Sequence, residues 1–240
     1  MTAQMNSTLR LAGLVVLTTA MAGCLGSGSG NVPTGGGGGT TPPKSPFAAY
    51  DAAYKEATAN VLANAPTSDM PTSGSAKYTG QVMIGQVNAN GRGKVADGML
   101  GDLTVNVGFA NGVNSTVNGK VDNIRVKVGD KVTSRPGTLT TDYAKGLGLP
   151  STVAIMSNTI NVPTQGPRTL RTGSYSLTMG APVTAQNLPE LGIDGDLVLG
   201  VSGAFTGQGA KGGYGPASAL LFTGTVNAGG GSGTNYIKRN

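Results

Sequence analysis

The sequence predicts an all-β protein whose main domain is a single soluble, eight-stranded, antiparallel β-barrel. From Ser73 onward, apolar side chains recur at every second residue, as they do in half-buried strands. Gly, Asn and Pro turns separate these apolar runs at short intervals, which is typical of sandwiches and barrels. Only 12% of the residues are charged, and closure of the sheet removes the exposed strand edges that charges would otherwise protect.

The first 23 residues have the pattern of an export signal. Arg10 is the only charged residue before Cys24, and residues 11–20 are mostly apolar. This apolar run is about half of the roughly 20 residues that a membrane-spanning helix needs. Small or unbranched residues at positions 21–23 then form a cleavage site. We therefore expect residues 1–23 to be a signal peptide.

Cys24 is the only cysteine, so the chain cannot form an internal disulfide. The run Met21-Ala22-Gly23-Cys24 resembles a bacterial lipobox, in which the cysteine is lipidated and becomes the new N-terminus. Two or three acyl chains, at about 0.8 kcal/mol for each buried CH₂, would hold the protein on a membrane. Leu25, rather than Asp, follows the cysteine, which resembles the sorting pattern for the outer membrane. The alternative is ordinary secretion with a free thiol.

Residues 24–45 are expected to be a flexible linker after the lipidated cysteine. They include five consecutive glycines at positions 35–39 and a Pro-Pro pair at positions 42 and 43. Such a segment buries too little apolar surface to offset the entropy lost on ordering. The glycine run lacks the Lys-Ser/Thr pair of a phosphate-binding loop, so we interpret it as a spacer.

A short amphipathic helix is expected at residues 46–66, ahead of the barrel. Ser45 and Pro46 suit the N-cap and the first helical position, and Pro66 ends the pattern. Apolar side chains recur at helical spacing on one face: Phe47, Tyr50, Tyr54, Ala57 and Val61. An apolar stripe of this kind usually packs on the protein core. The alternative is an aromatic ligand-binding face.

The barrel domain is expected to occupy residues 70–228, with about eight strands. Residues 103–109 alternate clearly, and Asn111 and Gly112 then form the strongest short hairpin signal. The apolar phase slips by one residue between Val121 and Ile124, which predicts a bulge near residues 122–123. Further runs are predicted at residues 78–84, 175–179, 197–205 and 220–226, with weaker ones at 138–143 and 153–162. Leu220, Phe222 and Val226 are expected to share a face. Residues 229–240 are expected to be a flexible tail.

Four segments resemble the transferrin-binding protein B-like family of β-barrel lipoproteins, which is itself similar to the barrel of factor H-binding protein. They are residues 70–80, residues 101–112 with 117–119, residues 214–216, and residues 224–225. The resemblance implies an eight-stranded barrel on a lipid anchor, often displayed on the outer surface of Gram-negative bacteria. Members bind host proteins, iron-carrier proteins or haem through variable loops. Those loops share no motif, so the ligand-binding residues here are unknown.

The composition argues against an enzyme and against a resident metal or other cofactor. The chain has no histidine and no tryptophan, which removes Ser-His and Cys-His nucleophiles and the usual zinc sites. A haem would need Tyr or Met as its axial ligand. Residues 207–212 match G-x-G-x-x-G, but no helical pattern follows, so we interpret them as a hairpin loop. Residues 194–196 (Asp-Gly-Asp) are interpreted as a turn rather than a calcium site.

The net charge is +6, and removal of residues 1–23 leaves 16 Lys and Arg against 11 Asp and Glu, a net charge of +5. These charges are scattered and few aromatic residues accompany them, so we expect no nucleic-acid partner. An excess of positive charge also suits an acidic surface or partner.

These observations predict an outer-membrane lipoprotein, exposed at the cell surface and monomeric, whose barrel binds a protein or small ligand. By the resemblance, the ligand is a host protein, an iron carrier or haem. The glycine-rich loops at residues 89–93 and 207–215 are the expected contact regions. The alternative is a structural lipoprotein of the envelope that faces the periplasm and captures no ligand.

Overall fold

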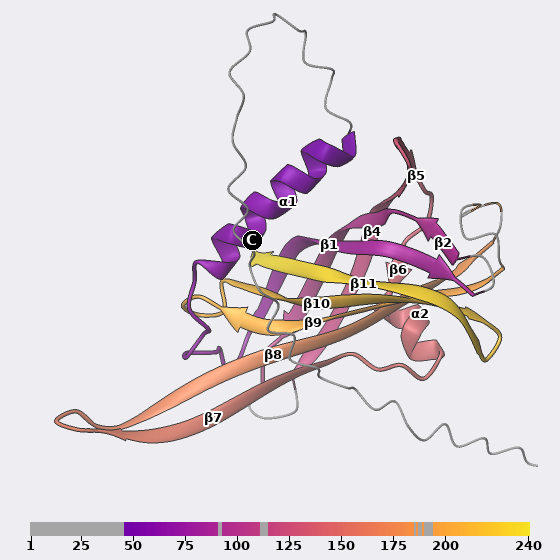
Figure 1. The fold of residues 1–240 in the computed structure, drawn as a ribbon. Helices are drawn as coiled ribbons and strands as arrows, with labels where there is room; N and C mark the ends of the chain where they lie inside the picture. The colour runs from indigo at the N-terminus through magenta and orange to yellow at the C-terminus, as the bar shows by residue number, and fades with distance from the viewer. Residues whose placement is uncertain (1–45, 91–92, 111–114, 185, 187–188, 190–193) are drawn as a thin grey trace, which may run out of the picture. The chain divides into compact units, whose positions relative to one another are not determined.

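The computed structural model describes residues 46–90, 93–110, 115–184, 186, 189 and 194–240. Figure 1 shows the order of the elements along the chain. They are α1 (Pro46–Leu62), β1 (Ser75–Ala89), β2 (Gly93–Ala96), β3 (Gly98–Gly108), β4 (Thr116–Val128), β5 (Lys131–Ser134), β6 (Leu139–Thr140), α2 (Thr141–Gly146), β7 (Thr152–Val162), β8 (Gly166–Val183), β9 (Gly195–Thr206), β10 (Gly212–Thr223) and β11 (Val226–Arg239).

Eight strands close into an antiparallel barrel, which confirms the predicted fold class. Their order around the wall is β1, β3, β4, β6, β8, β9, β10 and β11, and β11 pairs back with β1. Within the described residues, β2, β5 and β7 each pair with one strand only: β1, β4 and β8 respectively. The wall is thinnest at β6, which contributes only two residues between β4 and β8.

One apolar face of each long strand fills the barrel. The largest side chains that are almost completely buried are Met70, Tyr78, Ile84, Leu100, Leu103, Leu139, Leu177, Met179, Leu197, Leu199, Phe205 and Leu221. Phe205 lies among three other rings, with its centroid 5.3 Å from that of Tyr175, 5.7 Å from that of Tyr78 and 6.4 Å from that of Phe109. These tilted and edge-to-face contacts favour a solid aromatic core at one end of the barrel.

The predicted bulge in β4 is confirmed. Leu100 pairs with Arg125, whereas Asp102 pairs with Asp122, so β4 carries one extra residue at this point. Asn123 has a φ of 51° there, a left-handed conformation that Asn tolerates better than most residues. The bulge lets both Val121 and Ile124 point into the core. The predicted turn at residues 111–112 lies outside the described residues.

The prediction of a flexible tail at residues 229–240 is wrong, and the barrel therefore extends to Arg239. These residues form most of β11, which pairs with β1 on one side and β10 on the other. A Cβ atom on Gly233 would lie 1.8 Å from the carbonyl oxygen of Met83, and one on Gly230 would lie 2.3 Å from that of Ala219. The glycines that suggested a flexible tail are thus the residues that let the backbone of β11 lie close to the backbones of β1 and β10.

Two local predictions near β10 and β6 are also wrong. Leu220 and Phe222 do share a face of β10, but it is the partly buried one, because Ala219 and Leu221 are the buried residues. β10 ends at Thr223, so Val226, which is 66% exposed, belongs to β11 instead. Both faces of β10 are apolar, so alternation alone could not choose the inner one. Residues 138–143, predicted as a strand, form β6 and the start of α2.

The Thr140 side chain decides this change from strand to helix. Its hydroxyl accepts a hydrogen bond from the backbone N–H of Tyr143 at 3.2 Å, which caps α2.

Helix α1 begins at Pro46 as predicted and ends at Leu62, four residues before the predicted boundary. Tyr54 and Val61 are buried against Tyr236 of β11, which confirms for these two that the helix stripe packs on the barrel. The Tyr54 and Tyr236 ring centroids are 5.3 Å apart, and the Tyr54 hydroxyl lies 2.7 Å from that of Thr234. The side chains of Phe47 and Tyr50 lie outside the described residues. No helix in the described part is long and apolar enough to cross a membrane.

Candidate binding surface

The described residues leave little empty space inside the barrel. An internal cavity between β1, β3, β4 and β9 has a volume of about 10 Å³ and an apolar lining. It is lined by Val82, Met99, Leu100, Gly101, Val121, Ile124, Leu139 and Leu199. Such a space is at the lower limit for a single water molecule, which would also need polar partners. This cavity is too small for an organic ligand, and the larger hollows lie on the outside of the barrel.

The chain between α1 and β1 closes one end of the barrel. The N–H of Thr67 donates to the Phe205 carbonyl at 3.0 Å, and the N–H of Met70 donates to the Arg171 carbonyl at 3.0 Å. Met70 is 1% exposed and fills the space beside Gly173, where a Cβ atom would lie 2.5 Å from the Met70 Cε. This segment is therefore a plug that is held by backbone hydrogen bonds and one buried side chain.

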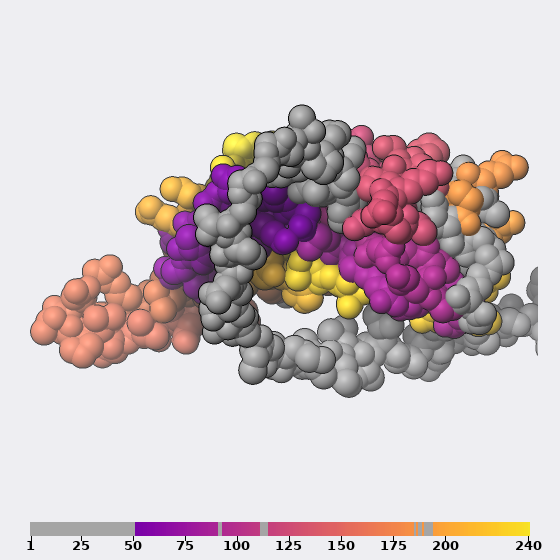
Figure 2. All heavy atoms as spheres, turned by 45° about the horizontal axis from the view of Figure 1, so that its top comes forward, coloured from indigo at the N-terminus to yellow at the C-terminus, as the bar shows by residue number. Residues whose placement is uncertain are grey.

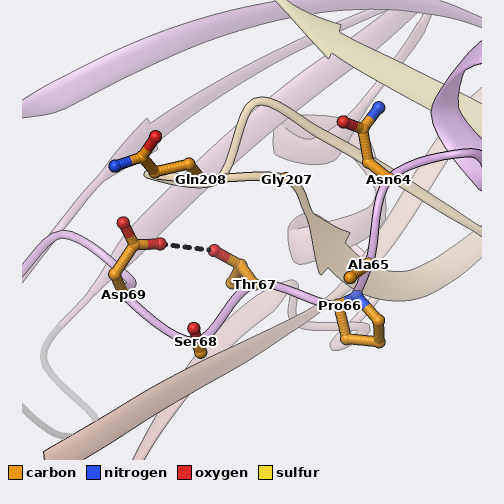
Figure 3. A pocket seen from close by; sticks show the side chains of 8 residues that line it. All are labelled: Asn64, Ala65, Pro66, Thr67, Ser68, Asp69, Gly207 and Gln208. Carbon is orange, nitrogen blue, oxygen red and sulfur yellow. Dashed lines mark hydrogen bonds between the residues drawn. The ribbon is translucent and has the colours of Figure 1, made fainter.

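A hollow of about 450 Å³ lies on the outside of this plug. Figure 3 shows its eight lining residues: Asn64, Ala65, Pro66, Thr67, Ser68, Asp69, Gly207 and Gln208. The first six come from the chain after α1, and the last two come from the turn between β9 and β10. Most of these residues are exposed, so the hollow is open to solvent.

Thr67 and Asp69 fix the shape of this hollow. The Thr67 hydroxyl donates to Asp69 Oδ1 at 3.1 Å, and the backbone N–H of Gly209 donates to the same oxygen at 2.7 Å. The N–H of Ala210 also donates to the Thr67 hydroxyl at 3.3 Å. Gly209 and Ala210 have φ values of 64° and 58°. The carboxylate thus holds a left-handed turn against the plug.

The groups around the hollow offer hydrogen bonds rather than reaction chemistry. They are one carboxylate, the amides of Asn64 and Gln208, and the hydroxyl of Ser68. A nucleophile would need a neighbouring general base, and the eight lining residues supply no base other than Asp69, which already accepts two hydrogen bonds. The arrangement suits contact with a polar surface, such as a loop of another protein.

The two predicted contact loops lie at opposite ends of the barrel. Gly212 pairs with Lys238 and Lys238 pairs with Thr79, whereas Ala89 pairs with Gly229 at the far end of β1. Residues 207–211 form the turn beside the hollow, and residues 212–215 belong to β10. Residues 91 and 92 of the other loop lie outside the described residues. The structure therefore does not bring the two loops into one site.

A groove of about 310 Å³ runs from the hollow along α1, and sequence reasoning missed it. Its lining includes Asn60 and Asn64 from α1 and the chain after it, and Lys211, Tyr236 and Lys238 from the barrel. Burial raises the pKa of Tyr236 above its ordinary value. Of the residues that line the groove, Lys211 and Gly212 lie in the predicted contact loop at residues 207–215, whereas Lys238 lies in the segment predicted to be a tail.

The prediction of a turn at residues 194–196 (Asp-Gly-Asp) is wrong, because Gly195 and Asp196 begin β9 and pair with β8, and Asp196 makes a structural contact. The Tyr143 hydroxyl of α2 donates a short hydrogen bond to Asp196, and this carboxylate raises the pKa of Tyr143 to about 12. The described residues contain no group of three His, Cys, Asp or Glu side chains that could hold a metal ion. The G-x-G-x-x-G match lies on the turn into β10, which confirms its interpretation as a hairpin loop.

The outer part of the β7–β8 hairpin extends beyond the barrel wall and is held to the plug at Arg171. We call residues 156–172 the ribbon, and both views show it standing clear of the barrel wall (Figures 1 and 2). Residues 156–161 are all exposed, including Met156 at 66% and Ile160 at 39%. The sequence predicted the strand at residues 153–162 but not its departure from the barrel.

Comparisons of this chain with protein-family models, with curated proteins and with solved structures find no match. The resemblance to transferrin-binding protein B-like lipoproteins therefore stays a prediction. The structure itself establishes the fold, a closed antiparallel barrel of eight strands with a filled interior and several hollows on its outside, of which the hollow and the groove described above are two.

Proposed function

We propose that this protein is an outer-membrane lipoprotein, anchored through Cys24 and displayed at the cell surface, whose barrel binds a protein ligand on its outside. The observation that carries this proposal is the contrast between the filled interior, with its cavity of about 10 Å³, and the open outer hollow of about 450 Å³, whose lining offers both polar and apolar groups. A barrel that carries small ligands needs an internal cavity of at least their size.

The same contrast favours a protein over haem among the ligands implied by the family resemblance. The internal cavity is far too small for a macrocycle, and the chain has no histidine to act as an axial ligand. The hollow and the groove instead present amides, hydroxyls, a carboxylate and two lysines. Such groups suit the polar parts of a protein interface.

Surface display is tested by labelling a single thiol on intact Gram-negative cells. Thr223 is exposed at the end of β10, so Thr223→Cys provides a thiol while Cys24 is acylated. A membrane-impermeant maleimide should label it as strongly on intact cells as after lysis. In a Cys24→Ser variant the protein should leave the membrane fraction. Labelling only after lysis would contradict surface display and favour the periplasm-facing structural role.

Ligand capture is tested with an iron-carrier protein, a transferrin, and with haem as the competing probe. Gln208→Trp fills the hollow, whereas Gln86→Trp places the same side chain on an exposed position of β1 outside the hollow. We expect the transferrin to bind and Gln208→Trp to weaken binding by about tenfold or more, as expected for a blocked contact. Equal binding by both variants would exclude the hollow, and tight haem binding would contradict a protein ligand.

A further inference from the structure

The free edge of β7 has no protection against strand pairing. Within the described residues, β2 and β5 also pair on one side only, but each has four residues and includes a lysine. Short, charged edges of this kind prevent association between sheets. β7 has 11 residues and no charge, glycine or proline. Its register with β8 is also free of bulges.

The other edge of the ribbon, on β8, is protected. Pro167 lacks a backbone N–H, and Arg168 and Arg171 place two charges along this edge. Asp69 also forms an isolated bridge with Arg171, so the plug segment covers part of the edge. Only the β7 side of the ribbon is therefore open to a further strand.

The ribbon lacks the packing that normally stabilises two strands. A single two-stranded hairpin is at best marginally stable in water, and further strands or a packed face are needed. The side-chain hydrogen bonds of this ribbon are exposed, for example Thr159 to Thr169 at 3.3 Å and Arg168 to Gln165 at 2.8 Å. The exposed Met156 and Ile160 lie on one face, because they are four residues apart in a strand.

We propose that the free edge of β7, residues 156–162, pairs with the same edge of a second copy to form a two-fold, antiparallel, four-stranded sheet. Centred on Thr159, this pairing places Met156 opposite Val162 of the second copy and Asn158 opposite Ile160. In a pairing centred on Thr159, even-numbered residues of one copy lie opposite even-numbered residues of the other. Because side chains of directly opposite residues point to the same face, Met156, Ile160 and Val162 of both copies share one face of the sheet.

The distribution of charge on the ribbon favours a second copy of the chain as the partner that pairs along the free edge of β7. The paired edge is uncharged, so no like charges meet across it. Arg168 and Arg171 lie on the outer strands, where equivalent residues of the two copies are three strand spacings apart, about 14 Å. That separation exceeds the Debye length of about 8 Å at physiological salt, so their repulsion is weak.

The size of this contact sets the strength of the dimer. Seven residues from each copy are well below the roughly 20–30 residues per side of a standard interface. The dimer is therefore weak and forms as concentration rises, while a dilute sample is the monomer that the sequence predicts. The pairing needs no lipid anchor and no ligand. A test of the pairing is therefore independent of a test of the proposed function.

Cysteine cross-linking tests the pairing on the full-length chain. With Cys24→Ser as background, Thr159→Cys provides the only thiol at the two-fold axis, where Cα atoms about 4.5–5.5 Å apart allow a disulfide. Thr169→Cys is the matched control, since Thr169 pairs with Thr159 and is equally exposed but lies on the outer strand. We expect Thr159→Cys to form the disulfide dimer at least about tenfold faster, because its thiols are held together.

A charge pair provides the second measurement. Thr159→Lys places two ammonium groups opposite each other across the axis, whereas Thr169→Lys keeps them on the outer strands. Sedimentation equilibrium up to about 1 mM should show dimers of the unmodified chain and of Thr169→Lys, but not of Thr159→Lys. Equal cross-linking of the two cysteine variants, or dimers that survive Thr159→Lys, would overturn the proposal. A chain that stays monomeric at every concentration would also overturn it.

Discussion

Strands β11 and β7 differ in the opposite way to what their compositions predict: the glycine-rich strand is fully paired, and the strand rich in β-branched residues is paired on one side. β11 contains four glycines in its sequence VNAGGGSGTNYIKR, yet it pairs on both sides and closes the barrel. β7 is rich in Val, Ile and Thr, which favour strands, yet its outer half pairs on one side and is exposed. The comparison shows that intrinsic strand propensity does not decide which strand obtains partners on both sides and closes the wall.

The largest expected effect comes from adding a side chain to β11. In Gly233→Val, the Cβ atom alone would lie 1.8 Å from the Met83 carbonyl oxygen, so β1 and β11 must separate. We expect a loss of roughly 4 kcal/mol or more in unfolding free energy, or failure to fold. Denaturant unfolding measures this loss. Ser232→Val, at the exposed neighbouring position, is the control, and equal stability of the two variants would contradict the close approach.

A smaller loss of unfolding free energy is expected from removing a buried amide of β11 that is hydrogen-bonded to β8, β9 and β10. Asn235 accepts a hydrogen bond from the Tyr175 hydroxyl at 2.7 Å and donates to the carbonyls of Ser202, Gly215 and Pro216. Asn235→Ala leaves these buried groups without their partner and should cost about 3 kcal/mol. Thermal unfolding measures the cost. The exposed Asn106→Ala is expected to change stability by less than about 0.5 kcal/mol, and a similar result for Asn235→Ala would refute the role of this amide.

Alkaline pH should weaken the barrel but spare the ribbon, which has no tyrosine. Burial raises the pKa of Tyr54 and of Tyr78 to about 12, from an ordinary value near 10. Above pH 10 the unfolded chain therefore loses protons that the folded chain keeps, so stability is complete below about pH 10 and falls as pH rises toward 12. For the fully buried Tyr78 alone, the loss at about pH 11 is roughly 1 kcal/mol.

Tyrosinate absorbance and denaturant unfolding across this pH range test the effect. Tyr78→Phe should reduce the slope, although it also removes the hydrogen bond from the Tyr78 hydroxyl to the Ala210 carbonyl. Titration of every tyrosine near pH 10, with constant stability up to pH 11, would contradict the burial of these hydroxyls.

The smallest effect is expected in the ribbon. Met156 is 66% exposed, so Met156→Ser should change the unfolding free energy of the monomer by less than about 0.5 kcal/mol. The same substitution should reduce dimer formation, because Met156 lies in the proposed contact. A large loss of monomer stability would mean that the ribbon packs on the barrel and that β7 and β11 differ less than the structure indicates.

Much of the local structure follows from the sequence because its causes are local. The alternation of Leu103, Val105 and Val107 predicts β3, and the phase slip after Val121 predicts the bulge at Asn123. The stripe that includes Tyr54 and Val61 predicts which side of α1 meets the barrel. Each of these signals depends on neighbours within a few residues along the chain.

The hollow and the groove on the outside of the barrel could not be predicted in the same way. The hollow joins Asp69 to the turn at Gly209, which is 140 residues away in the sequence. The groove joins Asn60 to Lys238. Contacts between residues so far apart in the sequence leave no periodic pattern that could predict them. The glycine-rich loops at residues 89–93 and 207–215 were predicted as contact regions from their composition alone.

The sequence by itself determined the all-β class, the positions of the main strands and the helix before them. Only the tertiary structure decided that residues 229–239 complete the wall, that Leu221 rather than Leu220 faces inward, and that β7 extends beyond the barrel. The physical reason is that strand propensity and side-chain alternation are properties of one segment. The closure of the barrel, the face of a strand that points inward and the presence of a free strand edge depend instead on which distant segment supplies the backbone hydrogen bonds.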